Sequence, residues 1–228
     1  MKTTIAGVSS MATRLILGEL AQRYEAASGV GVAIKAMGGV DAARLVREGE
    51  ATDIVVLASG PMAKLEAEGH ILTGSIKGFA RSGMAIAVRT GAEPPDISDE
   101  DAVRRAVLAA KTVCYSTGPS GDHLLQLCER WGLPADSERL LKAPPGVPVG
   151  SLVAQGDADL GFQQLSELIH VPGIAVVGPL PPEIQAVTVF AAGVCSASAQ
   201  PAQTQDLIAY LTSPDTDGVK RDQGMEPA

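Results

Sequence analysis

The chain has 228 residues, of which 46% are hydrophobic and 19% are charged, and its formal net charge is −8. This length and composition allow one large domain or two smaller lobes with apolar cores, and they exclude a disordered chain. The negative charge and the lack of any run of Lys or Arg argue against nucleic-acid binding. No stretch approaches ~18 uninterrupted apolar residues, so we expect no membrane-spanning helix.

Three cysteines, Cys114, Cys128 and Cys195, are an odd number and show no CxxC or Cys/His ligand spacing. We therefore expect core thiols, with no disulfide framework and no metal site. The start of the chain has no long apolar segment of the kind found in a signal peptide. We expect a periplasmic protein if a signal peptide precedes this segment in the encoded protein, and a cytoplasmic one otherwise.

Strands and helices alternate along the first part of the chain. Because only 3% of the residues are aromatic, their cores must be built from Ala, Val, Leu and Ile, as in buried sheets covered by Ala-rich helices. The alternation predicts right-handed crossovers and a mostly parallel sheet. The predicted elements are strand 3–8, helix 12–28, strand 31–37, helix 41–48, strand 53–58 and helix 61–68.

The same pattern restarts near residue 85, which predicts a second lobe. The long strand 185–194 then carries the chain back to the first lobe. The predicted elements of this part are strand 85–89, helix 99–110, strand 112–116, helix 121–131, helix 150–155, strand 159–163, strand 174–179, strand 185–194 and helix 203–211, with a polar tail after them.

Ligands of open α/β sheets bind beyond the carboxyl ends of the strands, where loops lead into helices. Ser9 and Ser10 follow the first strand, and they either donate to an anion or cap the next helix. Gly38 and Gly39 follow the second strand and allow close approach of a ligand to the backbone.

Two further loops lie in the second half of the chain. Thr117, Ser120 and Gly121 belong to the most ligand-like loop, since it combines hydroxyls, glycines and a following helix. Val147 belongs to a proline-rich loop that either lines the ligand or is a shaped connector. None of these loops carries a nucleotide-binding GxGxxG or GxxxxGK[ST] motif, or the GxSxG of a nucleophile elbow.

The order of several short motifs resembles that of the type II periplasmic solute-binding proteins, in particular their molybdate-binding group. The resemblance implies an α/β, two-lobed periplasmic-binding-protein-like fold with the ligand between the lobes. Lobe 1 would comprise residues 1–81 and 194–228, and lobe 2 residues 82–193. The motifs are Ser9-Ser10, Gly49 to Val56, Met62 to Gly69, Phe79-Ala80-Arg81, Gly156 to Phe162 and the closing segment Leu207 to Pro227.

The chain departs from the molybdate-binding pattern at two places. Gly38 and Gly39 stand where the family has a Gly-Ser-Ser-Gly type loop, and Gln164 stands where it has a tyrosine. Both changes favour a carboxylate over molybdate. Arg81 either offers a guanidinium fork to such a carboxylate or is a surface arginine at the hinge.

Two functions follow from this resemblance. The chain is either a solute-binding protein for a small anion, a di- or tricarboxylate or an oxyanion, or an isomerase similar to aconitate isomerase. The isomerase needs a group that takes and returns a proton, and His123 is our candidate, with a partly exposed helix histidine as the alternative. Neither function demands a cofactor. The expected partners are the anion and, for a receptor, the membrane component of an ABC transporter.

Overall fold

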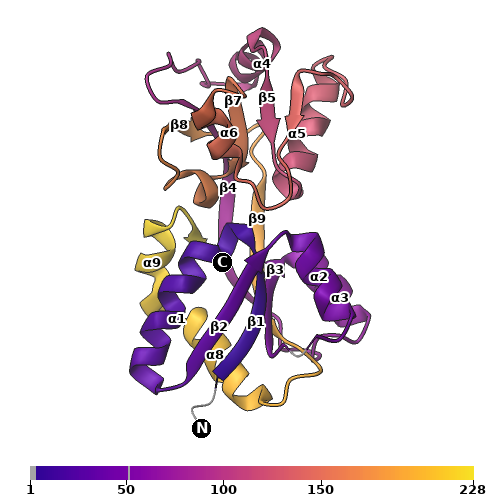
Figure 1. Ribbon diagram of the computed structural model, residues 1–228, viewed down its shortest axis with the longest axis vertical. Helices are drawn as coiled ribbons and strands as arrows, with labels where there is room; N and C mark the ends of the chain where they lie inside the picture. The colour runs from indigo at the N-terminus through magenta and orange to yellow at the C-terminus, as the bar shows by residue number, and fades with distance from the viewer. Residues whose placement is uncertain (1–3, 51) are drawn as a thin grey trace. The chain divides into compact units, whose positions relative to one another are not determined.

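The computed structural model describes residues 4–50 and 52–228 (Figure 1). Thr3, where the first strand was expected to begin, and Ala51, inside one of the family motifs, lie outside the described residues. Internal contacts divide the chain into unit 1, Met1–Arg81 with Val189–Ala228, and unit 2, Ser82–Thr188.

The second boundary falls at Val189 rather than at the expected residue 194. The reason is strand β9 (Val187–Val194), whose residues from Phe190 to Val194 all pair with strand β3 (Ile54–Ala58) of unit 1.

The sheet of unit 1 is built around three parallel strands, which an antiparallel strand extends. Strand β1 (Thr4–Ser10) lies between β2 (Gly31–Met37) and β3, parallel to both, and β9 runs antiparallel to β3. The order β2-β1-β3-β9 leaves β2 at the edge. The parallel part is the βαβ arrangement that the alternating pattern predicts.

Helices cover both faces of this sheet (Figure 1). Ile54 and Val56 of β3 pack into one core with helices α1 and α8, and Val55 and Leu57 pack into a second core with α2 and α3. Burial on both faces explains the uninterrupted apolar run of this strand. The helices are η1 (Met11–Thr13), α1 (Arg14–Ser28), α2 (Gly39–Arg47), α3 (Ser59–Ala67), α8 (Pro201–Leu211), η2 (Pro214–Thr216) and α9 (Asp217–Asp222).

Unit 2 repeats this design around a second core. Strand β5 lies between β6 and β7 and is parallel to both, and the long strand β4 runs antiparallel to β7 and β8. Its elements are β4 (Lys77–Arg89), which begins in unit 1, α4 (Glu100–Ala109), β5 (Val113–Tyr115), α5 (Pro119–Arg130), β6 (Leu140–Lys142), α6 (Val149–Gln155), β7 (Leu160–Gln164), α7 (Leu165–Leu168) and β8 (Ile174–Pro179).

The prediction of a polar tail after residue 211 is wrong. Helix α9 follows, and β10 (Glu226–Pro227) then pairs antiparallel with β4. Lys220 of α9 is buried, with its Nζ 3.1 Å from Asp217 Oδ1 and 5.8 Å from the ring centroid of Phe79. Partners within the fold therefore order a segment whose composition is polar. No helix in residues 4–50 and 52–228 has the length and apolar character needed to cross a membrane.

Candidate functional site

The carboxyl ends of the three parallel strands meet at one edge of unit 1. Ser10 is paired with Met37 of β2, and Ser9 with Val56 of β3. The loops that follow each strand therefore lie next to one another. This edge brings together the predicted residues Ser9, Ser10, Gly38 and Gly39.

Ser9 and Ser10 are both buried, at 0% and 8% exposure. The Ser9 hydroxyl donates to the Ser10 carbonyl at 3.3 Å, and Ser10 Oγ lies 3.5 Å from Thr13 Oγ1. The Ser10 side chain accepts no hydrogen bond from the helix that it precedes, so the capping alternative is wrong for this hydroxyl. The Thr13 hydroxyl donates to the Ser10 carbonyl at 3.1 Å, so the Ser10 hydroxyl is the donor in the longer contact, and an anion would have to take this donor from Thr13.

Gly38 and Gly39 begin helix α2, and no side chain caps its first amides. A Cβ on Gly39 would meet no atom closer than Leu57 Cδ2 at 3.9 Å, so the space beside it is open. Ser59, at the start of α3 after β3, holds the corresponding position in the third loop, and its hydroxyl donates to the Val189 carbonyl at 3.1 Å. Our sequence reasoning missed Ser59, although the strand followed by Ser-Gly-Pro repeats the signal used at Ser9.

Unit 2 has a similar edge, because β5 pairs with both β6 and β7 at Tyr115. The loop after β5 leads into helix α5, whose first amides have no side-chain cap. Ser120 is 3% exposed, and its hydroxyl lies 2.9 Å from Ser116 Oγ. Thr117 is exposed and Gly121 is buried in the first turn. The uncapped start of this twelve-residue helix and its hydroxyl pair favour an anion, whereas the exposed carboxylate of Asp122 in the first turn opposes one.

Two other predicted residues of unit 2 are engaged within it. The Val147 amide donates to the Pro144 carbonyl at 3.0 Å. This turn is what we expect if the loop only connects two elements. The Gln164 side chain is 3% exposed and lies 2.8 Å from Thr188 Oγ1. With its amide nitrogen turned towards Ser82, it also donates to the Ser82 carbonyl at 2.7 Å. These contacts hold both residues within unit 2, and their place beside a ligand stays a prediction.

Arg81 is exposed, and its backbone pairs with Glu226 in the β4–β10 ladder. Within the described residues its guanidinium forms no ion pair. Arg14, the first residue of α1, is a second arginine of unit 1 without an ion pair among the described residues. Sequence reasoning did not select Arg14, since its missing partner is a property of the folded chain.

His123 is half-buried on α5, and its Nε2 lies 2.8 Å from the Ile184 carbonyl oxygen. Because a carbonyl only accepts hydrogen bonds, Nε2 carries the proton and Nδ1 of the neutral ring is the basic nitrogen. His123 is thus a partly exposed helix histidine, as the alternative expected, and its ring is held by this contact. Its role as proton carrier stays a prediction. The contact orients the ring and fixes its tautomer.

The three cysteines are buried. Burial raises the pKa of the Cys114 thiol to about 12 and that of Cys128 to about 11. It also raises the pKa of Cys195. Such thiols are poor nucleophiles at neutral pH. No cluster of His, Cys, Asp and Glu suited to a metal ion occurs in the described part of the chain.

The family model described as "Bacterial extracellular solute-binding protein" matches residues 5–226. A curated relative, the aconitate isomerase of Pseudomonas sp, is 38% identical over 232 residues, which cover 99% of this chain and 88% of that protein. The sequence similarity therefore extends over both units.

Solved structures of low sequence identity share the fold. The periplasmic molybdate-binding protein of Azotobacter vinelandii has a TM-score of 0.79 at 20% identity, over 97% of this chain and 98% of that chain. The sulfate-binding protein of Mycobacterium tuberculosis also has a TM-score of 0.79, at 18% identity, over 99% and 87% of the two chains. These similarities confirm the α/β fold of the two-lobed periplasmic binding proteins.

Proposed function

Because the chain belongs to the bacterial extracellular solute-binding protein family, we propose that it binds a small tricarboxylate and shifts its double bond, as an aconitate isomerase does. The observation that carries this proposal is the 38% identity to the Pseudomonas enzyme over 99% of the chain. Similarity at this level extends through both units. A shared fold alone would not indicate which ligand the protein binds.

The two strand edges supply the donors in this proposal. Ser10 is the proposed anion donor of unit 1, next to Ser9, whose hydroxyl already donates to the Ser10 carbonyl, and Ser120 and Gly121 are the proposed anion donors of unit 2. The support is local: uncapped helix starts in both units, and buried hydroxyls beside them. Amides and hydroxyls fixed in this way bind an anion without the cost of reorganising the chain. Arg81 adds a charged donor for a carboxylate.

His123 is the proposed proton carrier. Its Nδ1 takes a proton from the methylene carbon of the tricarboxylate, and the C–H electron pair becomes part of a new carbon–carbon double bond. The electron pair of the old double bond then takes the proton at the other end of the allylic system. No water or electron is consumed, so the reaction needs only one group that removes and returns a proton. The contact from Nε2 to Ile184 supports this role, since it leaves Nδ1 as the base.

A transport receptor is the second candidate, and the family description favours it. As a receptor, the protein would act in the periplasm and deliver its anion to the membrane component of an ABC transporter. The same donors serve this function, because binding alone requires no proton carrier.

One experiment separates the candidates. Incubation of the purified protein with trans-aconitate, followed by chromatography, gives cis-aconitate if the protein is an isomerase. A protein that raises its melting temperature with trans-aconitate but leaves the compound unchanged overnight is a receptor.

The base is tested with His123→Gln, because the glutamine amide can still donate to Ile184 but cannot remove a proton. We expect the rate to fall about 100-fold or more. His170→Ala, at an exposed histidine after α7, is the control and should retain the rate. Full activity of His123→Gln would exclude His123 as the base.

A further inference from the structure

Arg14 differs from the other arginines on the helices of unit 1. Its guanidinium is exposed, and no carboxylate of the described residues pairs with it. The other helical arginines of this unit are each paired with Glu or Asp: Arg23 with Glu19 at 2.7 Å, Arg44 with Glu48 at 2.9 Å, Arg47 with Glu68 at 2.7 Å and Arg221 with Glu226 at 3.3 Å. The charge of Arg14 is thus available to a molecule from outside the chain.

The position of Arg14 in its helix adds an electrostatic argument. Arg14 is the first residue of α1, and the first turn of this helix contains no acidic residue. A cation at this end is opposed by the helix dipole, so Arg14 lowers the stability of the unliganded chain slightly. A bound anion would remove that cost. The paired Arg23 lies nine residues further on, about 14 Å along the same helix.

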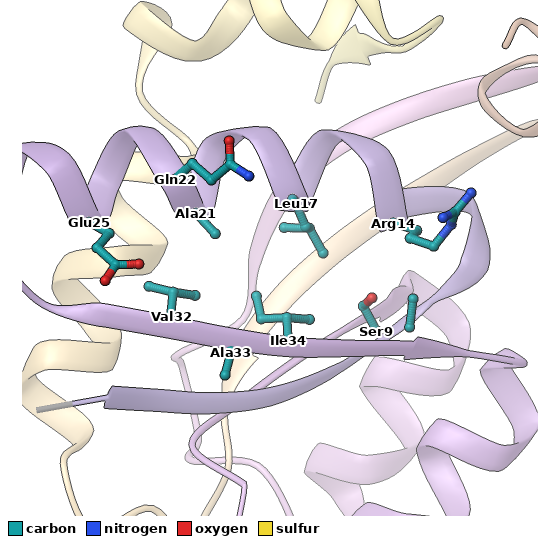
Figure 2. Close-up of a pocket in the computed structure, with 11 residues that line it drawn as sticks. Ser9, Arg14, Leu17, Ala21, Gln22, Glu25, Val32, Ala33 and Ile34 are labelled. Carbon is teal, nitrogen blue, oxygen red and sulfur yellow. The ribbon is translucent and has the colours of Figure 1, made fainter.

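A cavity of about 270 Å³ lies between α1 and β2 of unit 1 (Figure 2). Leu17 and Ile34 line its middle, and Ser9 and Arg14 lie together at one end. Ser9 belongs to the strand edge already described as the anion site of unit 1. Arg14 and Ser9 therefore line the same cavity, although they belong to different elements.

We propose that Arg14 binds one carboxylate of the ligand, next to the carboxylate held by the serine loop. This inference rests on the proposed function and specifies it further: Arg14 selects ligands that carry an additional carboxylate. A guanidinium suits this role because its planar fork donates two parallel hydrogen bonds to one carboxylate.

The test compares two ligands that differ in one carboxylate. Trans-aconitate carries a carboxymethyl group where mesaconate, methylfumarate, carries a methyl group. We expect the wild type to bind trans-aconitate at least 10-fold more tightly than mesaconate in calorimetry. Arg14→Gln should lose this preference, whereas Arg23→Gln, which removes the same charge from the same helix, should keep it.

Unfolding without ligand distinguishes this role from a structural one. The melting temperature of unliganded Arg14→Gln should equal or exceed that of the wild type, because no ion pair is lost and an unfavourable charge is removed. A lower melting temperature, or an unchanged preference for trans-aconitate, would overturn the assignment of Arg14 while the proposed function stands. A wild type that binds neither compound would overturn the proposed function and this inference with it.

Discussion

Gly121 lies against the carbonyl of Ser116, so that a Cβ added to Gly121 would stand 1.8 Å from the Ser116 oxygen. This contact folds the loop after β5 tightly onto the first turn of α5. Glycine is required here by close approach of the backbone, since the loop has no room for a side chain. The contact fixes the amides that we propose as anion donors.

Gly121→Ala should therefore move the loop. We expect it to lower the free energy of unfolding by about 1 to 3 kcal/mol and to weaken ligand binding. Gly118→Ala is the matched control in the same loop, because its backbone is extended and a Cβ there would meet no atom within 4 Å. Urea unfolding measures both variants. Equal stability of Gly121→Ala and the wild type would contradict the tight packing of this loop.

The hydroxyls of Ser10 and Ser120 give a second prediction, which concerns binding. Each replacement by Ala should weaken binding of the best ligand by roughly 1 to 3 kcal/mol, because a hydrogen bond to a charged acceptor is lost. Calorimetry with di- and tricarboxylates measures the change. If both variants bind as tightly as the wild type, the anion binds elsewhere on the protein.

Asp53 gives a prediction for pH. Burial opposes its charge, but hydrogen bonds from Ser198, Ala6 and Gln200 outweigh burial and hold the pKa of this carboxyl below its ordinary value of 3.8. A lowered folded-state pKa contributes stability above the unfolded pKa, and this contribution is lost as the pH falls through the folded value.

Asp53→Asn should thus lower the free energy of unfolding by about 1 to 3 kcal/mol at pH 7, and by less below pH 4. Asp136→Asn, at an exposed carboxylate of unit 2, makes the same charge change and should have little effect. Urea unfolding at pH 7, 5 and 3 gives the comparison. A loss for Asp53→Asn that stays constant over this range would show that charge does not matter at this site.

The buried thiols should resist alkylation. With a pKa of about 12, Cys114 is ionised in about one molecule in ten thousand at pH 8. Iodoacetamide should leave the native protein and its activity unchanged over an hour, and should label all three cysteines in urea. Rapid loss of activity on labelling of Cys114 would identify it as a catalytic thiol.

The strand ends that form the candidate site were predictable, because each rests on a local signal. The apolar run ending at Ala58, for example, predicts a buried strand, and small polar residues after such a strand mark a loop. These signals located Ser10 and Ser120 without knowledge of the fold.

Partners distant in the sequence were not predictable. His123 meets Ile184 across 61 residues, and Arg47 pairs with Glu68 across 21. An arginine without a partner, such as Arg14, is recognised only when the partners of the other arginines are known. The burial of Lys220 was also not predictable. The residues around it in the sequence are polar, and Phe79, against which it is buried, is distant in the sequence.

The central claim, allylic proton transfer on a tricarboxylate, is tested most directly by incubating the protein with trans-aconitate in deuterated water and recording proton and deuterium NMR spectra. We predict cis-aconitate with deuterium at the methylene carbon, formed about 100-fold more slowly by His123→Gln and at the wild-type rate by His170→Ala. Trans-aconitate that is recovered unchanged and free of deuterium, from a protein whose melting temperature it raises, would contradict catalysis.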